Sequence, residues 1–510
     1  YGDTGLIMYN RQEHLNPFLT VRTSDSLGLF LDDQWSVGDR LTVNVGVRYD
    51  RMTTKYGEGE VYEMPNTPAD INNPTFLRKR ESTDNIFDFK TFSPRIGLTY
   101  MLTNDGKTVL RANYGRYYMP LSVENLRRFG PDMPMVNRNN LQYNIPWDQV
   151  DVNGNDYVDY DEVIIATRLM HDIGPFTGYW STNDVSWKLN VGDNVKDQHT
   201  DQFSISLERE LAADLSIEAS YIYKNTGNLL VNWPLNKLTG EYWDYQRVTH
   251  TTEYGQTVQL YDLVLQDFNA DGVIDGGDVQ YVTDNTGHEV INMPDVDGIK
   301  ARRLYQGFQL VLRKRYSNRW QLNASALFSK TDGSAPRSKR QDFFVEGPMI
   351  VDDLWVGSLN QLTNNMEGPM PFTPRFELKI SGSYRIPAVE VDLGFRFRFH
   401  NGRPLWPLTN VPTRSPWANP DGSVVSTGGA TIVGIDPNNP EWLPGTKILD
   451  LSFGRNFKVG NLGSLSVMLD ILNVFNDNSP TLVDWTSGQL GRVMAVTAPR
   501  KIRMNVRFDF

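Results

Sequence analysis

Long stretches of this sequence alternate strictly between apolar and polar residues. Across residues 389–399 the odd positions read Val, Val, Leu, Phe, Phe, Phe, and the even positions between them read Glu, Asp, Gly, Arg, Arg. A period of two puts the two sets of side chains on opposite faces of a β-strand, so each face meets a different medium. No other feature of the chain constrains its fold class as strongly.

The same alternation recurs along the whole chain. It is clear in residues 41–49, 215–223, 320–328, 465–471 and 502–510. We count about fourteen such segments of roughly ten residues or more, which is the length a tilted strand needs to cross a bilayer. The sequence therefore predicts an all-β protein whose strands are long enough to span a membrane.

The connections between these segments alternate between two sizes. Short turns are expected at residues 37–40, 103–107, 210–214, 317–319, 386–389 and 458–463. Long irregular stretches are expected at about 53–87, 121–195, 233–299, 333–372 and 406–444. Short turns on one rim and long loops on the other are typical of outer-membrane barrels. The pattern predicts an antiparallel up-and-down transmembrane β-barrel with short periplasmic turns and long extracellular loops.

Side-chain chemistry separates the two faces. The apolar positions carry aromatic residues near the strand ends, as a membrane-interface girdle would. The other positions carry charges, which are costly against lipid and are expected to face a lumen. These arginines either bind an anionic ligand or contact a plug domain and one another: Arg48, Arg111, Arg313, Arg315, Arg385, Arg396, Arg398, Arg503 and Arg507. The alternative fold is a β-sandwich with a solvated face, whose strands are usually shorter.

Composition and motifs exclude several function classes. The formal net charge of −11 argues against broad nucleic-acid binding. The sequence has no cysteine, and no apolar run is long enough for a membrane-spanning helix. The six histidines form no HExxH pair, and no GxSxG elbow or phosphate loop occurs. We therefore predict that the chain is not an enzyme. The chain begins at Tyr1, which indicates a processed or truncated start.

Three segments resemble the barrel of TonB-dependent receptors, most closely the branch with Oar-like barrels and carboxypeptidase-regulatory-type N-terminal domains. They are LGLFLDDQWSVGDRLTVNVGVRYDRM (27–52), FSPRIGLTYMLTNDGKTVLRANYGRYY (92–118) and LDILNVFND (469–477). The final FDF resembles the aromatic signal read by the barrel-assembly machinery, which implies a lipid-facing Phe510 in a strand that closes the barrel. The resemblance implies the bacterial outer membrane and uptake of a large or scarce extracellular solute, energised through TonB.

The resemblance also leaves parts of the family pattern unaccounted for. Barrels of that family have twenty-two strands, with an N-terminal plug and a TonB box. Residues 1–510 supply about fourteen strands, so the plug and the first strands are expected to be absent from this chain. Either the chain is the C-terminal part of a longer one, or a partner supplies the remainder. A smaller barrel closed by these strands alone is the alternative.

Two acidic loops have the oxygen spacing of a Ca²⁺ site. In DFNADGVIDGGD (267–278) the donors are Asp267, Asn269, Asp271, the Val273 carbonyl, Asp275 and Asp278, with Gly272 at the sharp turn. In DVNGNDYVDYDE (151–162) they are Asp151, Asn153, Asn155, the Tyr157 carbonyl, Asp159 and Glu162. We expect structural calcium in both extracellular loops. The alternative is a pair of solvated loops rich in Asx turns.

Three functional hypotheses follow. The first is a TonB-dependent transporter, with outer-membrane lipid, a solute, the TonB complex and the assembly machinery as partners and no nucleic acid. The second is a passive porin-like or adhesion barrel with calcium-stabilised loops, and the third is a secreted calcium-binding enzyme or adhesin of the sandwich type. Loop tryptophans either stack on a sugar or peptide or pack loop against loop: Trp180, Trp187, Trp233, Trp243, Trp406, Trp417 and Trp442.

Overall fold

The structure is a computed structural model in which most, but not all, of the chain is described. The described residues are 6–14, 22–57, 59–62, 77–80, 82, 84–119, 138–146, 189–236, 238–251, 255, 257–264, 266–274, 278, 281, 286–295, 301–333, 374–404, 408–418, 424–433, 442–460, 462–483 and 492–510. Within these ranges, no helix has the length and apolar character needed to cross a bilayer.

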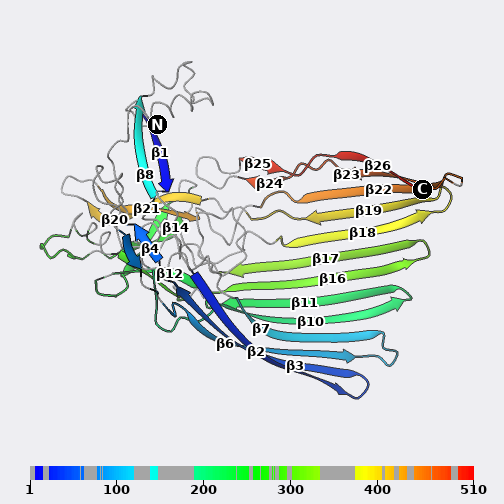
Figure 1. The fold of residues 1–510 in the computed structure, drawn as a ribbon, viewed down its shortest axis with the longest axis horizontal. Coiled ribbons are helices and arrows are strands. Elements are labelled where there is room, and N and C mark those ends of the chain that lie inside the picture. The colour runs from blue at the N-terminus through cyan, green and yellow to red at the C-terminus, as the bar shows by residue number, and fades with distance from the viewer. Residues whose placement is uncertain are drawn as a thin grey trace.

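One large sheet of thirteen strands dominates the molecule (Figure 1). The number is close to the roughly fourteen expected from the alternation, and every neighbouring pair in the sheet is antiparallel. In spatial order its strands are β2 (Arg22–Val37), β3 (Leu41–Tyr56), β6 (Asp88–Met101), β7 (Thr108–Tyr118), β10 (His199–Ala212), β11 (Leu215–Gly227), β16 (Arg303–Ser317), β17 (Trp320–Gly333), β18 (Phe376–Ile386), β19 (Val391–His400), β22 (Thr446–Lys458), β23 (Ser464–Leu472) and β26 (Lys501–Asp509).

The short turns and the long connections lie at opposite ends of this sheet (Figure 1). All six predicted short turns are confirmed, at residues 38–40, 102–107, 213–214, 318–319, 387–390 and 459–463. The two-residue turn at 318–319 has positive φ at both Asn318 (51°) and Arg319 (73°), as a type I′ hairpin requires. The five predicted long connections are present, and the sequence reading missed a sixth at residues 473–500.

The long connections are less irregular than the sequence suggested, because they contain strands of their own. Five strand pairs, four of which join consecutive strands, and one three-stranded sheet lie outside the large sheet. The pairs are β1 (Leu6–His14) with β8 (Arg138–Pro146), β4 (Gly59–Tyr62) with β5 (Leu77–Arg80), β13 (Tyr245–Thr251) with β14 (Thr257–Leu263), β20 (Leu408–Ala418) with β21 (Val424–Val433), and β24 (Pro480–Val483) with β25 (Val493–Val496). The three-stranded sheet joins β12 (Leu230–Asn236), β15 (Thr286–Asn292) and β9 (Leu189–Val191).

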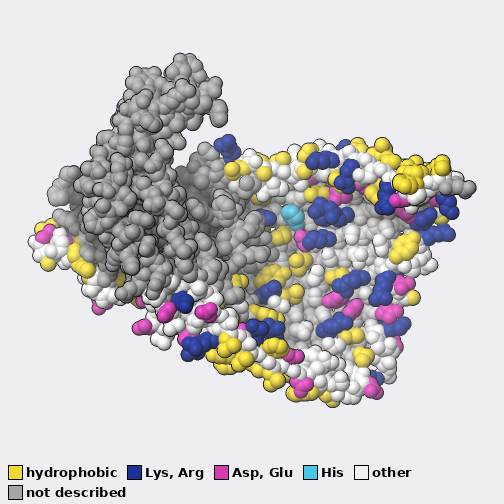
Figure 2. All heavy atoms as spheres, viewed as in Figure 1, with side chains coloured by type: hydrophobic (Ala, Val, Ile, Leu, Met, Phe, Trp, Pro, Cys, Tyr) yellow, Lys and Arg dark blue, Asp and Glu magenta, His cyan; other side chains and the backbone are white. Residues whose placement is uncertain are grey.

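The two faces of the large sheet differ as the alternation predicts. Large apolar side chains on one face remain exposed, including Leu29 (60%), Phe92 (60%) and Met504 (68%). Figure 2 shows basic and acidic side chains spread over the face toward the viewer, with hydrophobic side chains along the two margins of the sheet. A sandwich would bury its apolar face in a core, and no second layer covers this one among the described residues. We call the exposed apolar face the outer face and the charged face the inner face.

The large sheet does not close on itself within the described residues. β2 pairs only with β3, and β26 pairs only with β23, so each of these strands has one free edge. The expectation that the final strand closes a barrel is therefore not met by these thirteen strands alone. Phe508 and Phe510 are nevertheless on the outer-face parity of β26, where Phe510 is fully exposed.

An apolar cluster lies where the long connections meet the sheet. It contains Met52 and Phe89, which face each other across β3 and β6 on the inner-face parity, together with Phe87. Leu230 of β12 and Val290 of β15 complete it. The three-stranded sheet is therefore packed onto the inner face of the wall and forms a fixed cap on this part of the rim.

Candidate functional site

Ion pairs line the inner face of the large sheet. Because consecutive polar-parity residues face the same side, many of the arginines find a carboxylate on their own or a neighbouring strand. The pairs include Arg48–Asp50 (2.7 Å), Arg111–Glu208 (2.8 Å), Arg313–Glu218 (2.9 Å), Arg503–Asp470 (2.8 Å) and Arg507–Asp509 (2.7 Å). Of the two interpretations of these arginines, the pairing favours contact among charged residues of the wall. It speaks against a row of unpaired cations that bind an anionic ligand.

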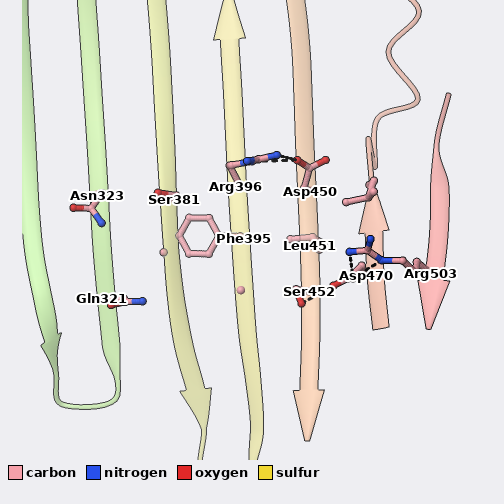
Figure 3. Close-up of a pocket in the computed structure, with 13 residues that line it drawn as sticks. Gln321, Asn323, Ser381, Phe395, Arg396, Asp450, Leu451, Ser452, Asp470 and Arg503 are labelled. Carbon is pink, nitrogen blue, oxygen red and sulfur yellow. Dashed lines mark hydrogen bonds and ion pairs between the residues drawn. The ribbon is translucent and has the colours of Figure 1, made fainter. Parts of the chain in front are cut away.

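A polar hollow of about 370 Å³ opens between β17 and β26 on this face (Figure 3). Strand register builds it from two adjacent rows of facing residues. One row runs Gln321, Ser383, Gly394, Ser452, Asp470, Arg503, and all of these except Ser383 line the hollow. The other row runs Asn323, Ser381, Arg396, Asp450.

Small residues make the floor of the hollow, and charged residues make its margin. Ser381, Gly394 and Ser452 have too little side chain to fill the space above them, whereas Arg396–Asp450 and Arg503–Asp470 stand at one side (Figure 3). Gly382 must also be small: a Cβ there would lie 2.6 Å from the Gln321 carbonyl oxygen and 2.8 Å from the ring of Phe395. An aromatic ring beside a glycine on the facing strand is a recurrent way of covering exposed backbone in sheets.

Asp450 connects the hollow to the neighbouring connection. Its Oδ2 accepts hydrogen bonds from Arg396 (3.1 and 3.3 Å) and lies 3.7 Å from Arg398. Its Oδ1 accepts the backbone N–H of Asn473 at 2.9 Å. Two arginines thus share one carboxylate, which leaves this side of the hollow with a positive excess and fixes the start of the connection after β23.

The LNVFND segment (472–477) forms a hydrogen-bond network around Asn473 and Asp477. Asn473 donates from Nδ2 to the carbonyl oxygens of Asp477 (3.0 Å) and Ala498 (2.8 Å), and its Oδ1 accepts the Asp477 N–H (2.9 Å). Burial opposes the charge on Asp477. The N–H of Ser479, the Thr497 hydroxyl and other donors outweigh that effect and hold its pKa below the usual value. This network connects the start of β22, the end of β23 and the residues that precede β26.

Asp197 is a buried carboxyl beside the wall. The residue precedes β10 and is only 6% exposed. Its Oδ1 has no hydrogen-bond partner among the described residues. Its backbone carbonyl accepts a hydrogen bond from Asn228 Nδ2 at 3.1 Å. Burial raises the pKa of Asp197 to about 7, because desolvation disfavours the charged form. This carboxyl is therefore a titratable group in the physiological range.

The loop tryptophans that the structure describes contact the protein itself. Trp233 (8% exposed) is buried in β12 of the cap, Trp243 (7%) is buried against Phe268, and Trp442 lies under the guanidinium of Arg375 at 4.2 Å. These positions support packing of the connections over stacking on a ligand. The side chains of Trp180, Trp187, Trp406 and Trp417 lie outside the described residues.

In the described part of the acidic loop 267–278, the side-chain oxygens accept hydrogen bonds from the loop's own backbone. Asp267 accepts the N–H groups of Asp271 (3.0 Å) and Gly272 (2.9 Å), and Asp271 accepts that of Val273 (2.8 Å). Gly272 has φ of +85°, the sharp turn expected at that position. Asp278 is fully buried and accepts the N–H of Phe268 at 2.7 Å.

The predicted calcium ligands are only partly placed. Asp267, Asn269, Asp271, Val273 and Asp278 lie in the described part of the loop, and Asp275 lies outside it. In the described residues, no group of three or more acidic or histidine side chains is close enough to hold a metal ion. The whole second loop, 151–162, lies outside the described residues, so its calcium site stays a prediction.

The hollow offers charged and hydrogen-bonding groups for binding. Its lining combines two arginines, two aspartates, two serines and two amides, which donate and accept hydrogen bonds side by side. The sequence reading named its arginines, but it did not bring Ser381, Gly394, Ser452 and Asp470 together. The signal lay in the small residues Gly and Ser on the polar parity, and it becomes legible only once strand register is known.

Comparison with known proteins places the chain among membrane barrels. The family model for the outer membrane beta barrel domain matches residues 5–395. The TonB-dependent transporter Oar of Myxococcus xanthus is 22% identical over 478 residues, which cover 91% of this chain and 37% of that protein. The chain thus spans little more than a third of the curated relative it matches.

Two receptors are among the solved structures that resemble this one. The ferric-catecholate import receptor Fiu of E. coli is 12% identical, with a TM-score of 0.43, and the match covers 96% of this chain and 45% of that one. The siderophore receptor PiuA of Acinetobacter baumannii is 10% identical, with a TM-score of 0.45, and covers 96% and 44%.

Proposed function

This chain belongs to the outer membrane β-barrel domain family, and we propose that it forms part of the wall of a TonB-dependent transporter. Its place is the bacterial outer membrane, and the transporters it resembles are not enzymes, as the sequence predicted. The similarity to Oar along 91% of the chain is the observation that carries the proposal. The transported solute would be large or scarce, and TonB would supply the energy.

The two faces of the sheet support this proposal. Lipid solvates the exposed apolar outer face, and the charged inner face borders a polar lumen. The inner face carries matched ion pairs and the hydrogen-bonding hollow, so it suits contact with a polar solute or polypeptide better than free passage of ions. Oar-like transport is therefore favoured over the passive or adhesive barrel.

The free edges of β2 and β26 require further strands. Backbone N–H and C=O groups left unpaired in hydrocarbon cost several kcal/mol each, so an open sheet would not persist in a bilayer. We propose that additional strands, from the same polypeptide or from a partner, complete the barrel around the lumen. A plug carried by that polypeptide would couple it to TonB.

Site-specific labelling tests the transport proposal. The chain has no cysteine, so Ser381→Cys in the floor of the hollow can be labelled without background from residues 1–510. In living cells that produce the full-length protein, a hydrophilic maleimide should label Ser381→Cys faster when TonB is functional, because energised movement of a plug opens the lumen. Phe92→Cys on the outer face is the matched control, and its labelling should not depend on TonB.

The same measurement separates the transporter from the passive barrel. A porin-like lumen is open at all times, so Ser381→Cys would be labelled at one rate with or without TonB. Steady open-channel conductance of the purified full-length protein in planar bilayers would agree with that result. Both outcomes together would overturn the transport proposal and leave the membrane fold intact.

We further propose that loop 267–278 binds Ca²⁺ as a structural ion. The support is its donor spacing, the turn at Gly272 and the three side chains, Asp267, Asn269 and Asp271, that already converge on the loop backbone. Phe268 packs the loop against the rest of its own connection, edge-on to Trp243 (5.4 Å) and stacked on Tyr281 (6.0 Å). A bound ion would stiffen a connection that packs on the wall.

Terbium luminescence tests this calcium site. Trp243 and Tyr281 lie next to the loop, so a lanthanide bound there should be excited through them and displaced by Ca²⁺. Asp271→Ala should remove the signal. Asp105→Ala is the control, because Asp105 likewise caps a turn by accepting the N–H of the residue two positions on, Lys107, without a calcium-like spacing. An unchanged number of bound ions in Asp271→Ala refutes the assignment.

A further inference from the structure

The outer face changes from apolar to charged at a sharp line near the long connections. On β3 and β6, Tyr49 faces Phe92 with ring centroids 5.0 Å apart. The next outer-face pair toward the connections is Arg51 opposite Lys90. Aromatic residues mark the interface of a bilayer, so the charged pair lies at the depth of lipid headgroups.

The same line recurs further along the sheet, and there its charges are matched. Beyond Phe203 on β10, the Asp201 carboxylate accepts hydrogen bonds from Nε and Nη2 of Arg116 (2.7 and 2.8 Å). It also accepts one from the Tyr114 hydroxyl (2.9 Å). Beyond Phe328 on β17, Lys330 is 2.5 Å from Asp332. In both places each cation has its own carboxylate.

The pair on β3 and β6 is not matched. Arg51 makes a two-point contact with Asp88 (3.0 and 2.9 Å), and the Lys90 ammonium lies 3.9 Å from the same carboxylate. Like charges directly opposite each other on neighbouring strands repel. Further along this face Asp25 and Lys55 add one charge of each sign, so among the described side chains of this patch one positive charge remains in excess.

We propose that Arg51 and Lys90 bind the phosphate of an anionic lipid headgroup in the leaflet on the side of the long connections. The Lys90 side chain is 59% exposed and that of Arg51 is 46% exposed, so both can reach a ligand. Arginine and lysine are the side chains that hold phosphate in proteins. Asp88 holds the guanidinium with two hydrogen bonds and makes only a longer contact, at 3.9 Å, with the ammonium.

The residues beneath this pair fit the remainder of a lipid. Leu27 faces Arg51 on β2, Leu29 faces Tyr49, and both leucines are about 60% exposed on the outer face. Below a phosphate held between Lys90 and Arg51, an acyl chain would lie along Phe92 and Tyr49, and the leucines of β2 extend this apolar surface to the side. A free phosphate ion would gain nothing from that apolar surface, which favours a lipid as the ligand.

The test compares lipid selectivity of the full-length protein with that of single variants. Protein in phosphatidylcholine vesicles is mixed with spin-labelled phosphatidylglycerol or spin-labelled phosphatidylcholine, and the motionally restricted fraction gives the relative association of each lipid. We expect Lys90→Gln to reduce the preference for phosphatidylglycerol about fivefold, which corresponds to about 1 kcal/mol for one basic side chain near anionic lipid.

Two further variants give the experiment its sign and its control. Asp88→Asn removes the competing carboxylate and should raise the preference for phosphatidylglycerol, an effect that misfolding would not produce. Lys330→Gln removes an equally placed but matched cation, and it should leave the preference near that of the unaltered protein. Equal preference in Lys90→Gln and the unaltered protein, or an equal loss in Lys330→Gln, overturns the proposal.

Discussion

Asp450 should stabilise the wall mainly through a backbone contact and only secondarily through its arginines. The residue's carboxylate is 13% exposed, whereas Arg396 and Arg398 are 58% and 42% exposed. An exposed ion pair contributes about 0–1 kcal/mol. A hydrogen bond to a charged group contributes about 1.5–3 kcal/mol, so the Asn473 N–H bond to Asp450 Oδ1 is expected to be the larger effect.

Two substitutions separate these contributions. Asp450→Ala removes both, leaves a backbone N–H without its acceptor and should lower the free energy of unfolding by about 2–4 kcal/mol. Asp450→Asn loses the charge but keeps an oxygen for the Asn473 N–H, so its cost should be about 1 kcal/mol. The free energy is measured by urea unfolding of the full-length protein from lipid vesicles.

Asp392→Asn is the control for a weak pair on the same strand face. Asp392 is 52% exposed and lies 3.7 Å from Arg385, so its loss should be nearly neutral. If Asp450→Asn proves as destabilising as Asp450→Ala, the charge and not the backbone bond holds this region. If neither differs from Asp392→Asn, the role given to Asp450 is wrong.

Three further predictions follow from single positions. Gly382→Ala should slow folding and lower barrel stability, because the added Cβ meets the Phe395 ring and backbone, whereas Gly454→Ala, with its nearest neighbour 4.0 Å away, should be tolerated in a heat-modifiability gel. Burial raises the pKa of Asp197 to about 7, so the folded protein holds a proton that the unfolded chain releases near pH 4, and stability should fall as pH rises between these values. Asp197→Asn should flatten the dependence of thermal stability on pH. Above pH 7 its free energy of unfolding should exceed that of the unaltered protein by as much as about 4 kcal/mol; parallel curves of stability against pH would refute this. Phe510→Ala should reduce the amount of folded protein recovered from cells without changing the stability of what does assemble, since its ring is fully exposed.

The sequence predicted the wall well because alternation reports directly on the medium at each face. The strand at residues 391–400 and the turn at 387–390 are visible in the order of apolar and polar letters alone. The same rule fails at Arg51 and Lys90, where charges stand on the apolar parity. There the medium changes along the strand, from hydrocarbon to headgroup, and a period of two carries no information about depth.

The hollow and the cap could not be predicted, because both depend on contacts between distant residues. Gly394 meets Ser452 only through strand register, which alternation does not set to better than two residues. β9 pairs with β15 in parallel, although the two strands come from different connections. Nothing local in residues 189–191 distinguishes that partner from any other.

The cap has a consequence for anyone who would exchange the connections of this barrel. Leu230 and Val290 come from one connection, but they cover Met52 and Phe89 of the wall itself. A graft that replaced this connection with a foreign segment would expose those two side chains to water. The loss of stability would be roughly 1.5–3 kcal/mol for each large apolar group uncovered. Sequence divergence in this connection is therefore constrained. Its outermost residues can vary freely, while the residues that pack on the wall must remain apolar.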